Sequence, residues 1–513
     1  MRRDLSLLTG RVHDLLVVGG GVHGAALAWD AALRGLTVAV MERDDFGAAT
    51  SANSLRIAHG GLRYLARGDV RRMRESIGER SRLMRIAPEL VVPLPVMVPT
   101  HGRGTGSRLS MRAALALNDL GSPGRNRGLD GAHRIPAGRV LSRAEAVRLF
   151  PPLATTGLTG AALWHDARIR SPERLTLSFV RSAAERGAAP ANYVRVERVL
   201  TEAGMVRGVE AVDRRTGRSL VVRARATVVA AGCWTDALVD RAAARTRAAG
   251  PARQALALNL MVGRSLSGVA VGVRSPSGPA DDPVIGGHRY LFLAPQEGAT
   301  LLGTWYAVDD GTDSPALAER GAEALRAEFN TACPGLDLEA EDVSRVQVGW
   351  MPLKAGLEPG RADALADRPR IREYGADGLR HLYSVEGVKY TTARGVAEQV
   401  LDRIVREVGL RAQGCRTAET HLTGAYHVPA GDPRLSARIR EAVREEMALS
   451  LADIIFRRTG IGEPPGPSLE ALDEAARLAG EELGWDDTAR QAEIDDVLRQ
   501  AGGPAATRRV VTG

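Results

Sequence analysis

The alternation of apolar and polar positions predicts a strand–helix–strand unit at the start of the chain. Residues 14–18 form a short apolar run followed at once by glycines, which is typical of a buried parallel strand. The alanine-rich stretch 22–34 has the length of a helix and ends at Gly35, and residues 36–41 form a second apolar run. This unit predicts an α/β domain built on a parallel sheet.

Later segments predict further strands and helices. We expect helices over 70–90, 173–186, 315–330 and 393–408, strands within 191–232 and over 256–263, 289–294 and 299–306, and helices from about 432 onward with a break at 460–467. Prolines at 93, 95 and 99 predict a break in the chain, and the Gly-, Arg- and Ser-rich stretch 100–135 predicts a surface connection.

Length and composition limit the class of protein. The chain has 513 residues, 44% of them hydrophobic, which predicts two or three domains rather than one core. It contains no run of about 18 apolar residues, so we expect no transmembrane helix. The basic N-terminus lacks the apolar segment of a signal peptide, which predicts a cytoplasmic protein. Cys233, Cys333 and Cys415 stand far apart, and we expect neither disulfides nor a metal site.

The charge pattern narrows the choice of partners. A net charge of +8 suits a small anionic substrate or an acidic membrane surface. The arginines are spread along the whole chain with little aromatic interleaving, so we expect no nucleic-acid partner. Lysine occurs only at Lys354 and Lys389. A site that needs a compact or deprotonatable amine cannot use arginine, which makes both lysines candidates for function.

The motif Gly19-Gly-Gly-Val-His-Gly24 lies directly between the first predicted strand and helix. Gly19 permits the tight turn, Gly21 lets the backbone approach a pyrophosphate, and Gly24 lets the helix pack on the strand. Glu42 ends the second strand, where a carboxylate can accept hydrogen bonds from a ribose diol. The pattern predicts a dinucleotide site, and the alternative is a glycine-rich turn that serves packing alone.

The position of the motif favours FAD over NAD. The motif lies at the extreme N-terminus, and a second apolar strand ends far downstream at Gly232. This spacing suits a flavoprotein whose FAD domain is assembled from distant segments. Hydroxyl groups and glycines within 49–65 offer further contacts to phosphate oxygens and to a flat ring.

The segment 50–65 also carries a resemblance to a known family. Its Thr-Ser-x-x-Ser start and its His-Gly-Gly-Leu-Arg-Tyr-Leu end resemble the hallmark of the FAD-dependent glycerol-3-phosphate dehydrogenase family, among the D-amino-acid-oxidase-like flavoproteins. Residues 385–394 are similar to that family's GGKLTTYR segment, and residues 445–459 resemble part of its C-terminal helical domain. The resemblance extends from about residue 12 to about residue 500.

The resemblance implies roles for the matching residues. Cofactor binding would fall to Gly19, Gly21, Gly24, Glu42, Thr50, Ser51, Ser54, Gly60, Gly61, Leu62, Val196, Gly232, Thr391 and Thr392. Catalysis would fall to His59, Arg63, Tyr64 and Lys389, with His59 as the candidate base and Lys389 as the cation that stabilises the reduced flavin. The alternatives are an exposed Arg63, a hydrogen-bonded core His59 and a surface Lys389.

The chain departs from the family around the predicted substrate pocket. The arginine of the family's GVRPL motif is Met351 here, and the family's Thr-Asp pair is Trp305-Tyr306. The glycine before the lysine is Val388, and a family histidine is Asn259. Methionine cannot form the bidentate anion contact of arginine. The resemblance implies glycerol 3-phosphate or a related phosphorylated polyol as the substrate, and the loss of this arginine means that the substrate need not be glycerol 3-phosphate itself.

We predict an α/β fold with a Rossmann-like FAD-binding domain, an inserted β-rich substrate domain and a C-terminal helical domain. The oxidoreductase would span 12–424, with FAD-binding segments near 12–80, 160–250 and 345–424, substrate segments near 81–159 and 251–344, and the helical domain at 425–513.

The implied reaction is hydride transfer from a CH–OH carbon to flavin N5, which yields a ketone. The alternatives are an oxidase of another hydroxy acid or amine, and a flavin-binding protein without turnover. The sequence does not identify the electron acceptor, for which a quinone and oxygen are the two candidates. Peripheral contact with the inner face of the membrane and a homodimer are both compatible with the sequence.

Overall fold

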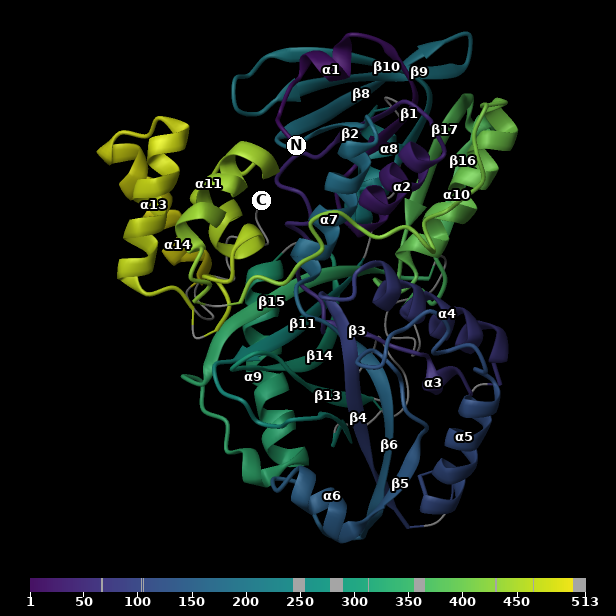
Figure 1. The fold of residues 1–513 in the computed structure, drawn as a ribbon, viewed down its shortest axis with the longest axis vertical. Helices are drawn as coiled ribbons and strands as arrows, with labels where there is room; N and C mark the ends of the chain where they lie inside the picture. The colour runs from purple at the N-terminus through teal and green to yellow at the C-terminus, as the bar shows by residue number, and fades with distance from the viewer. Residues whose placement is uncertain are drawn as a thin grey trace.

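The fold consists of two sheets and a C-terminal group of helices. The computed structural model describes residues 1–501 except 66–67, 103, 105, 243–253, 277–288, 312, 355–364, 430 and 465, and except the side chains of residues 63, 65 and 242. Figure 1 shows one sheet above the other and the C-terminal helices beside the upper sheet. The predicted combination of an α/β unit, a β-rich unit and C-terminal helices is confirmed.

The first sheet assembles strands from distant parts of the chain. Its order is β16-β17-β9-β10-β1-β2-β7, with β8 beside β9. The strands are β1 (Val12–Val18), β2 (Val38–Met41), β7 (Ala189–Ala191), β8 (Val194–Glu202), β9 (Met205–Asp213), β10 (Ser219–Val229), β16 (Arg370–Tyr374) and β17 (Leu379–Glu386). Because β2, β1, β10 and β17 are mutually parallel, their carboxyl ends lie at one edge of the sheet. Ligands of open α/β sheets bind at such an edge.

Three helices cover one face of this sheet. They are α2 (Val22–Leu33), α7 (Pro172–Glu185) and α10 (Ala393–Val408), and their apolar faces share one core with β1 and β2. Trp29 of α2 packs against Phe179 of α7 with ring centroids 5.4 Å apart. The opposite face is covered by the short helices α1 (Ser6–Thr9) and α8 (Thr235–Ala242) and by the β8–β9 hairpin. Burial on both faces explains the continuous apolar run of β1.

The second sheet has the order β15-β11-β14-β13-β12-β4-β6-β3, with β5 beside β6. The strands are β3 (Ile57–Ala58), β4 (Val91–His101), β5 (Arg139–Ser142), β6 (Leu158–Ile169), β11 (Gln254–Val262), β12 (Ala270–Arg274), β13 (Tyr290–Pro295), β14 (Thr300–Asp309) and β15 (Val343–Pro352). Helices α6 (Arg143–Leu149) and α9 (Ser314–Ala332) lie beside it, and α3 (Leu62–Leu65) and α4 (Val70–Ile86) precede β4.

The two faces of this sheet have different neighbours. In β11, Leu256, Leu258 and Leu260 belong to the core beside α9. Side chains alternate along a strand, so Asn259 and Met261 lie on the opposite face. Met261 packs there with Leu55 and Ile57. This second face therefore covers the segment 50–58 that the sequence assigns to the cofactor.

The structure corrects two expectations in the segment 93–135. Three prolines lie inside β4 rather than in a break, and β4 pairs along its whole length with β6. On its other side β4 pairs with β12 only at Val96 and Met97, so the missing proline N–H groups are not needed there. Within the expected surface connection, residues 108–120 form helix α5 (Arg108–Leu120), whose start is capped by Ser107.

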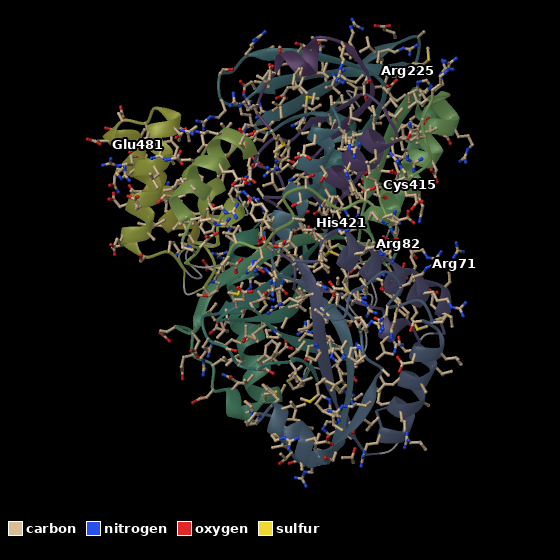
Figure 2. All side chains as sticks on the ribbon, viewed as in Figure 1. Arg71, Arg82, Arg225, Cys415, His421 and Glu481 are labelled. Atoms are coloured by element: carbon tan, nitrogen blue, oxygen red, sulfur yellow. The ribbon has the colours of Figure 1, made fainter. Side chains whose placement is uncertain are left out.

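The C-terminal helices form their own core beside the first sheet. They are α11 (Leu435–Glu446), α12 (Leu451–Asp453), α13 (Leu469–Leu483) and α14 (Asp487–Ala501). Arg457 and Arg458 of the π-helical turn 454–458 donate to the buried carboxylate of Asp45, at 2.6 and 2.8 Å. Asp45 follows β2, so these ion pairs fasten the helices close to the glycine turn. Figure 2 labels Cys415 and His421 in the segment that leads from α10 to this group.

The predicted domain boundaries stay a prediction. Strands β6 and β15 belong to the second sheet although they extend past the predicted limits at 160 and 345. Over the described ranges, no helix is both long and apolar enough to cross a membrane.

Candidate functional site

The glycine turn after β1 requires glycine at two positions. Gly19 has a φ of +107°, and a Cβ there would lie 2.6 Å from the carbonyl oxygen of Ala230 in the neighbouring strand segment. A Cβ at Gly24 would lie 1.9 Å from the carbonyl oxygen of Gly19. The absence of both side chains lets α2 pack directly on the turn. The N-terminus of α2 then faces the carboxyl edge of the sheet, where its N–H groups favour an anion.

Glu42 lies at the same edge, directly after β2. Its Oε2 accepts a hydrogen bond from the Gly20 N–H at 2.6 Å, and its Oε1 accepts one from the Asp44 N–H at 2.9 Å. Removal from water raises the pKa of the Glu42 carboxyl, and these two N–H donors oppose that rise. Each carboxylate oxygen keeps a further lone pair, which can accept a ribose hydroxyl.

The segment 50–54 connects the turn to the second sheet. The Ser51 hydroxyl accepts the Val22 N–H at 3.0 Å and so lies at the first turn of α2. The Thr50 hydroxyl accepts the Trp350 N–H of β15 at 3.1 Å. Ser54 accepts the Arg56 N–H at 3.3 Å. Thr50 and Ser51 therefore stand between the glycine turn and the second sheet.

Two further predicted cofactor residues come from β8 and β10. Gly232 follows β10 with a φ of +55°, at the edge shared with Gly19 and Glu42. Val196 of β8 is buried, and its side chain lines a small apolar cavity with Val18 and Val229.

The residues at this edge fit FAD. The glycine turn admits a pyrophosphate, the helix N-terminus supplies donors, and Glu42 supplies the ribose acceptor. The assignment of each residue to a part of the cofactor stays a prediction.

The predicted catalytic residues gather around Tyr64. The Lys389 Nζ lies 4.2 Å from the centroid of the Tyr64 ring, which is a cation–π distance. The His59 and Tyr64 ring centroids are 6.0 Å apart. Residues that are far apart in the sequence thus meet, and their catalytic roles stay a prediction. The Arg63 side chain lies outside the described residues, although its backbone belongs to α3.

The segment 59–61 rests on a buried ion pair that the sequence analysis did not identify. The Asp166 Oδ1 accepts the Gly60 N–H at 2.5 Å and the Arg80 Nη1 at 2.9 Å. A Cβ at Gly60 would lie 2.4 Å from the Arg80 Nη1, so the guanidinium occupies the space of a side chain. Burial lowers the pKa of Arg80, and Asp166 opposes that fall. Asp166 and Arg80 thus position the backbone between His59 and Tyr64.

The glycine turn and the lysine segment are in direct contact. His23 lies in the first turn of α2, and a Cβ at Gly387 would lie 1.8 Å from its Nε2. Burial lowers the pKa of His23 to about 4, so the imidazole is neutral near neutral pH. Thr391 and Thr392 follow Lys389, are buried, and lead into α10. Leu62 begins α3 beside Gly61.

The departures from the family pattern do not all lie near this site. Met351 and Asn259 are on the face of the second sheet that covers segment 50–58. Val388 is buried directly beside Lys389. Trp305, in contrast, packs against Gly321 of α9 on the opposite face, so its expected position beside the pocket is wrong. Strand alternation accounts for the difference, because Trp305 pairs with Leu258 rather than with Asn259.

Across the described parts of the chain, no group of at least three His, Cys, Asp and Glu side chains is arranged to hold a metal ion.

Glu42→Gln is expected to weaken FAD binding about 5-fold. The amide keeps an acceptor for a ribose hydroxyl but loses the charge, a difference of about 1 kcal/mol. Fluorescence titration of the apoprotein with FAD measures the effect. The control is Glu210→Gln, which changes a half-buried carboxylate on the same sheet that pairs with Arg198. Equal dissociation constants for the two variants would show that Glu42 does not bind the ribose.

Comparisons with known proteins extend this picture. A family model described as FAD dependent oxidoreductase matches residues 14–403, and one described as the C-terminal domain of alpha-glycerophosphate oxidase matches residues 370–490. Glycerol-3-phosphate dehydrogenase 1 of Mycobacterium tuberculosis is 32% identical over 486 residues, covering 92% of this chain and 88% of the relative. Glycerol-3-phosphate dehydrogenase of Synechocystis is 28% identical, covering 94% of this chain and 95% of the relative.

The fold is also similar to solved structures. The glycerol-3-phosphate dehydrogenase of Bacillus halodurans, solved in complex with FAD, matches with a TM-score of 0.69 at 21% identity. The match covers 97% of this chain and 96% of that one. At this identity the likeness concerns the fold, and it includes both sheets and the C-terminal helices.

Proposed function

The chain belongs to the FAD-dependent oxidoreductase family, and on this basis we propose that it oxidises glycerol 3-phosphate or a related phosphorylated polyol to the ketone. Relatives that are up to 32% identical over nearly the whole chain carry the name glycerol-3-phosphate dehydrogenase. One observation in particular supports the proposal: Lys389 contacts Tyr64 beside His59. The segment that carries Lys389 also contacts the glycine turn, where Gly387 lies against His23.

Each of these residues has a proposed task. FAD, when bound, would accept the hydride from the substrate carbon. Lys389 would attract the anionic substrate and hold positive charge at the ring, and Tyr64 would orient the ammonium group. His59 would accept the hydroxyl proton at a ring nitrogen. Asp166, through Gly60, would keep the backbone of His59 in place.

Anaerobic titration with glycerol 3-phosphate tests the proposal. Substrate oxidation without an acceptor bleaches the flavin absorbance, and the yield of dihydroxyacetone phosphate should equal the amount of flavin reduced. Bleaching by a hydroxy acid or an amine but not by phosphorylated polyols would favour an oxidase of another substrate. A yellow protein that no compound in the panel bleaches would favour a flavin-binding protein without turnover.

We expect the purified protein to be yellow and to release its FAD in mild acid. None of the three cysteines is among the residues proposed to bind the flavin, so we expect no thioether link to it. Acid precipitation followed by absorbance of the supernatant measures the release. Flavin that stays with the precipitate would contradict non-covalent binding and would direct peptide mapping to His59.

We also propose peripheral contact of α5 with an acidic lipid surface. Leu109, Leu117 and Leu120 of this helix are 79%, 54% and 79% exposed and lie along one side of it, with exposed Arg108 and Arg112 beside them. Apolar side chains flanked by arginines suit the boundary of an anionic membrane. Such contact would give access to a quinone as the electron acceptor. Flotation with anionic vesicles, compared with Leu109→Glu and Leu120→Glu, tests the proposal.

A further inference from the structure

We infer that Gln347, with Asn259 beside it, forms a neutral hydrogen-bonding subsite for an aliphatic hydroxyl group. The inference rests on the proposed function in one respect, because that function supplies two molecules with such hydroxyls. One is the substrate polyol, and the other is the ribityl chain of FAD.

The position of Gln347 follows from the alternation of β15. Val346 and Val348 pack into the core beside α9, so Gln347 and Gly349 lie on the opposite face. A Cβ at Gly349 would lie 3.1 Å from the Thr50 Cγ2. Gln347 therefore shares the face that contacts the predicted cofactor segment.

Asn259 stands directly opposite Gln347 in the paired strand β11. Paired residues of antiparallel strands have Cβ atoms within about 5.5 Å of each other, so the two amides are neighbours. The Thr304 hydroxyl donates to the Asn259 Oδ1 at 2.8 Å. A Cβ at Gly303 would lie 2.0 Å from the same oxygen and 3.2 Å from Leu55, so the Asn259 side chain also points toward the cofactor segment.

The side-chain amide of Gln347 is buried and lacks a hydrogen bond at its oxygen. It is 2% exposed, and its Oε1 has no hydrogen-bond partner among the residues that the structure describes. An unpaired buried amide oxygen is costly, and an apolar residue would pack better if the position were only structural. The arrangement is explained if a ligand donates a hydrogen bond to this oxygen.

The surroundings indicate that this ligand group is neutral. On this face, the residues next to the two amides along their strands are Ala257 and Met261 in β11 and Arg345 and Gly349 in β15, of which only Arg345 carries a charge. Arg345, the nearest charged residue on the face, stacks on Phe456 and donates to the Gly462 carbonyl oxygen. A buried phosphate would have only this already engaged guanidinium to balance its charge, and an ammonium would have no carboxylate among these neighbours, whereas a hydroxyl needs no counter-charge.

The test compares Gln347→Met with Gln296→Met in the FAD-loaded protein. Both substitutions remove a buried amide, and Gln296 lies in the turn between β13 and β14. The substrates are glycerol 3-phosphate and propane-1,2-diol 1-phosphate, which keeps the reacting hydroxyl and the phosphate but lacks the terminal hydroxyl. The FAD dissociation constant of each apoprotein is measured in parallel.

If the terminal hydroxyl of the substrate binds Gln347, Gln347→Met lowers kcat/KM for glycerol 3-phosphate about 10-fold, as expected for the loss of one hydrogen bond. The kcat/KM for propane-1,2-diol 1-phosphate then stays the same. If the ribityl chain binds, the FAD dissociation constant rises about 10-fold and both substrates are affected equally. Gln347→Met behaving like Gln296→Met in both measurements would overturn the inference.

A protein that glycerol 3-phosphate does not reduce would refute the proposed function separately. In that case, the FAD dissociation constants and flavin difference spectra with glycerol and propane-1,2-diol test whether Gln347 binds a hydroxyl. Binding that is independent of Gln347 in all of these measurements would overturn the inference as well.

Discussion

Gly24→Ala is expected to weaken FAD binding at least about 100-fold and to yield a colourless protein. The new methyl group would lie 1.9 Å from the carbonyl oxygen of Gly19, which is backbone and cannot rotate away. Either α2 or the turn must shift, at a cost of about 3 kcal/mol, as in an overpacked core. The shift would move the N–H groups of α2 away from the place of the pyrophosphate. Flavin content after purification and FAD titration of the apoprotein measure the loss.

Gly480→Ala provides the matched control for this substitution. Gly480 is also a buried helical glycine, in α13, but its nearest neighbour for a Cβ is the Trp485 side chain at 3.5 Å. Alanine there should be neutral or stabilising, because it favours the helix over glycine. A Gly24→Ala protein that binds FAD as the control does would contradict a close approach of the turn to the cofactor. Circular dichroism of both variants distinguishes a lost site from a lost fold.

The glycine turn could be predicted from the sequence because its requirements are local. Gly19 and Gly24 are five residues apart, and strand, turn and helix follow one another directly. The contact between Tyr64 and Lys389 needed the family resemblance, since no spacing connects residues from opposite parts of the chain. Neither local spacing nor the family resemblance indicated Asp166 and Arg80. Neither stands in a motif, and only the fold brings β6 and α4 beneath Gly60.

The differences between expectation and structure at β4, α5 and Trp305 also have physical explanations. The prolines of β4 are tolerated because β12 pairs with only two of its residues, which composition cannot reveal. Composition obscures helix α5, because glycine- and arginine-rich segments flank it on both sides. Trp305 was expected beside the pocket because its neighbours in sequence are there, but strand alternation directs it to α9. For the prolines of β4 and for Trp305, the deciding partner is a strand that is distant in sequence, β12 and β11 respectively.

Met351→Arg is expected to raise kcat/KM for glycerol 3-phosphate about 10- to 100-fold. A guanidinium at this position would restore the anion contact that the family resemblance implies, and charge-assisted hydrogen bonds contribute about 1.5–3 kcal/mol. Met351 lies on the same face of β15 as Gly349, which contacts Thr50. The Trp350 indole points to the other face, where its Nε1 donates to Asp309 at 2.8 Å. The indole therefore does not occupy the space that the new side chain needs.

Steady-state kinetics with an artificial electron acceptor decide this prediction, with Met351→Leu as the control of similar volume. Leucine should leave kcat/KM unchanged, because methionine offers the phosphate no charge that leucine would remove. Glycerol serves as the probe without phosphate, and its turnover should not improve in the arginine variant. The competing idea is that another arginine already reaches the phosphate from a different strand. In that case the wild type would oxidise glycerol 3-phosphate with a low KM, and Met351→Arg would be neutral or harmful because it adds a second cation to a satisfied anion.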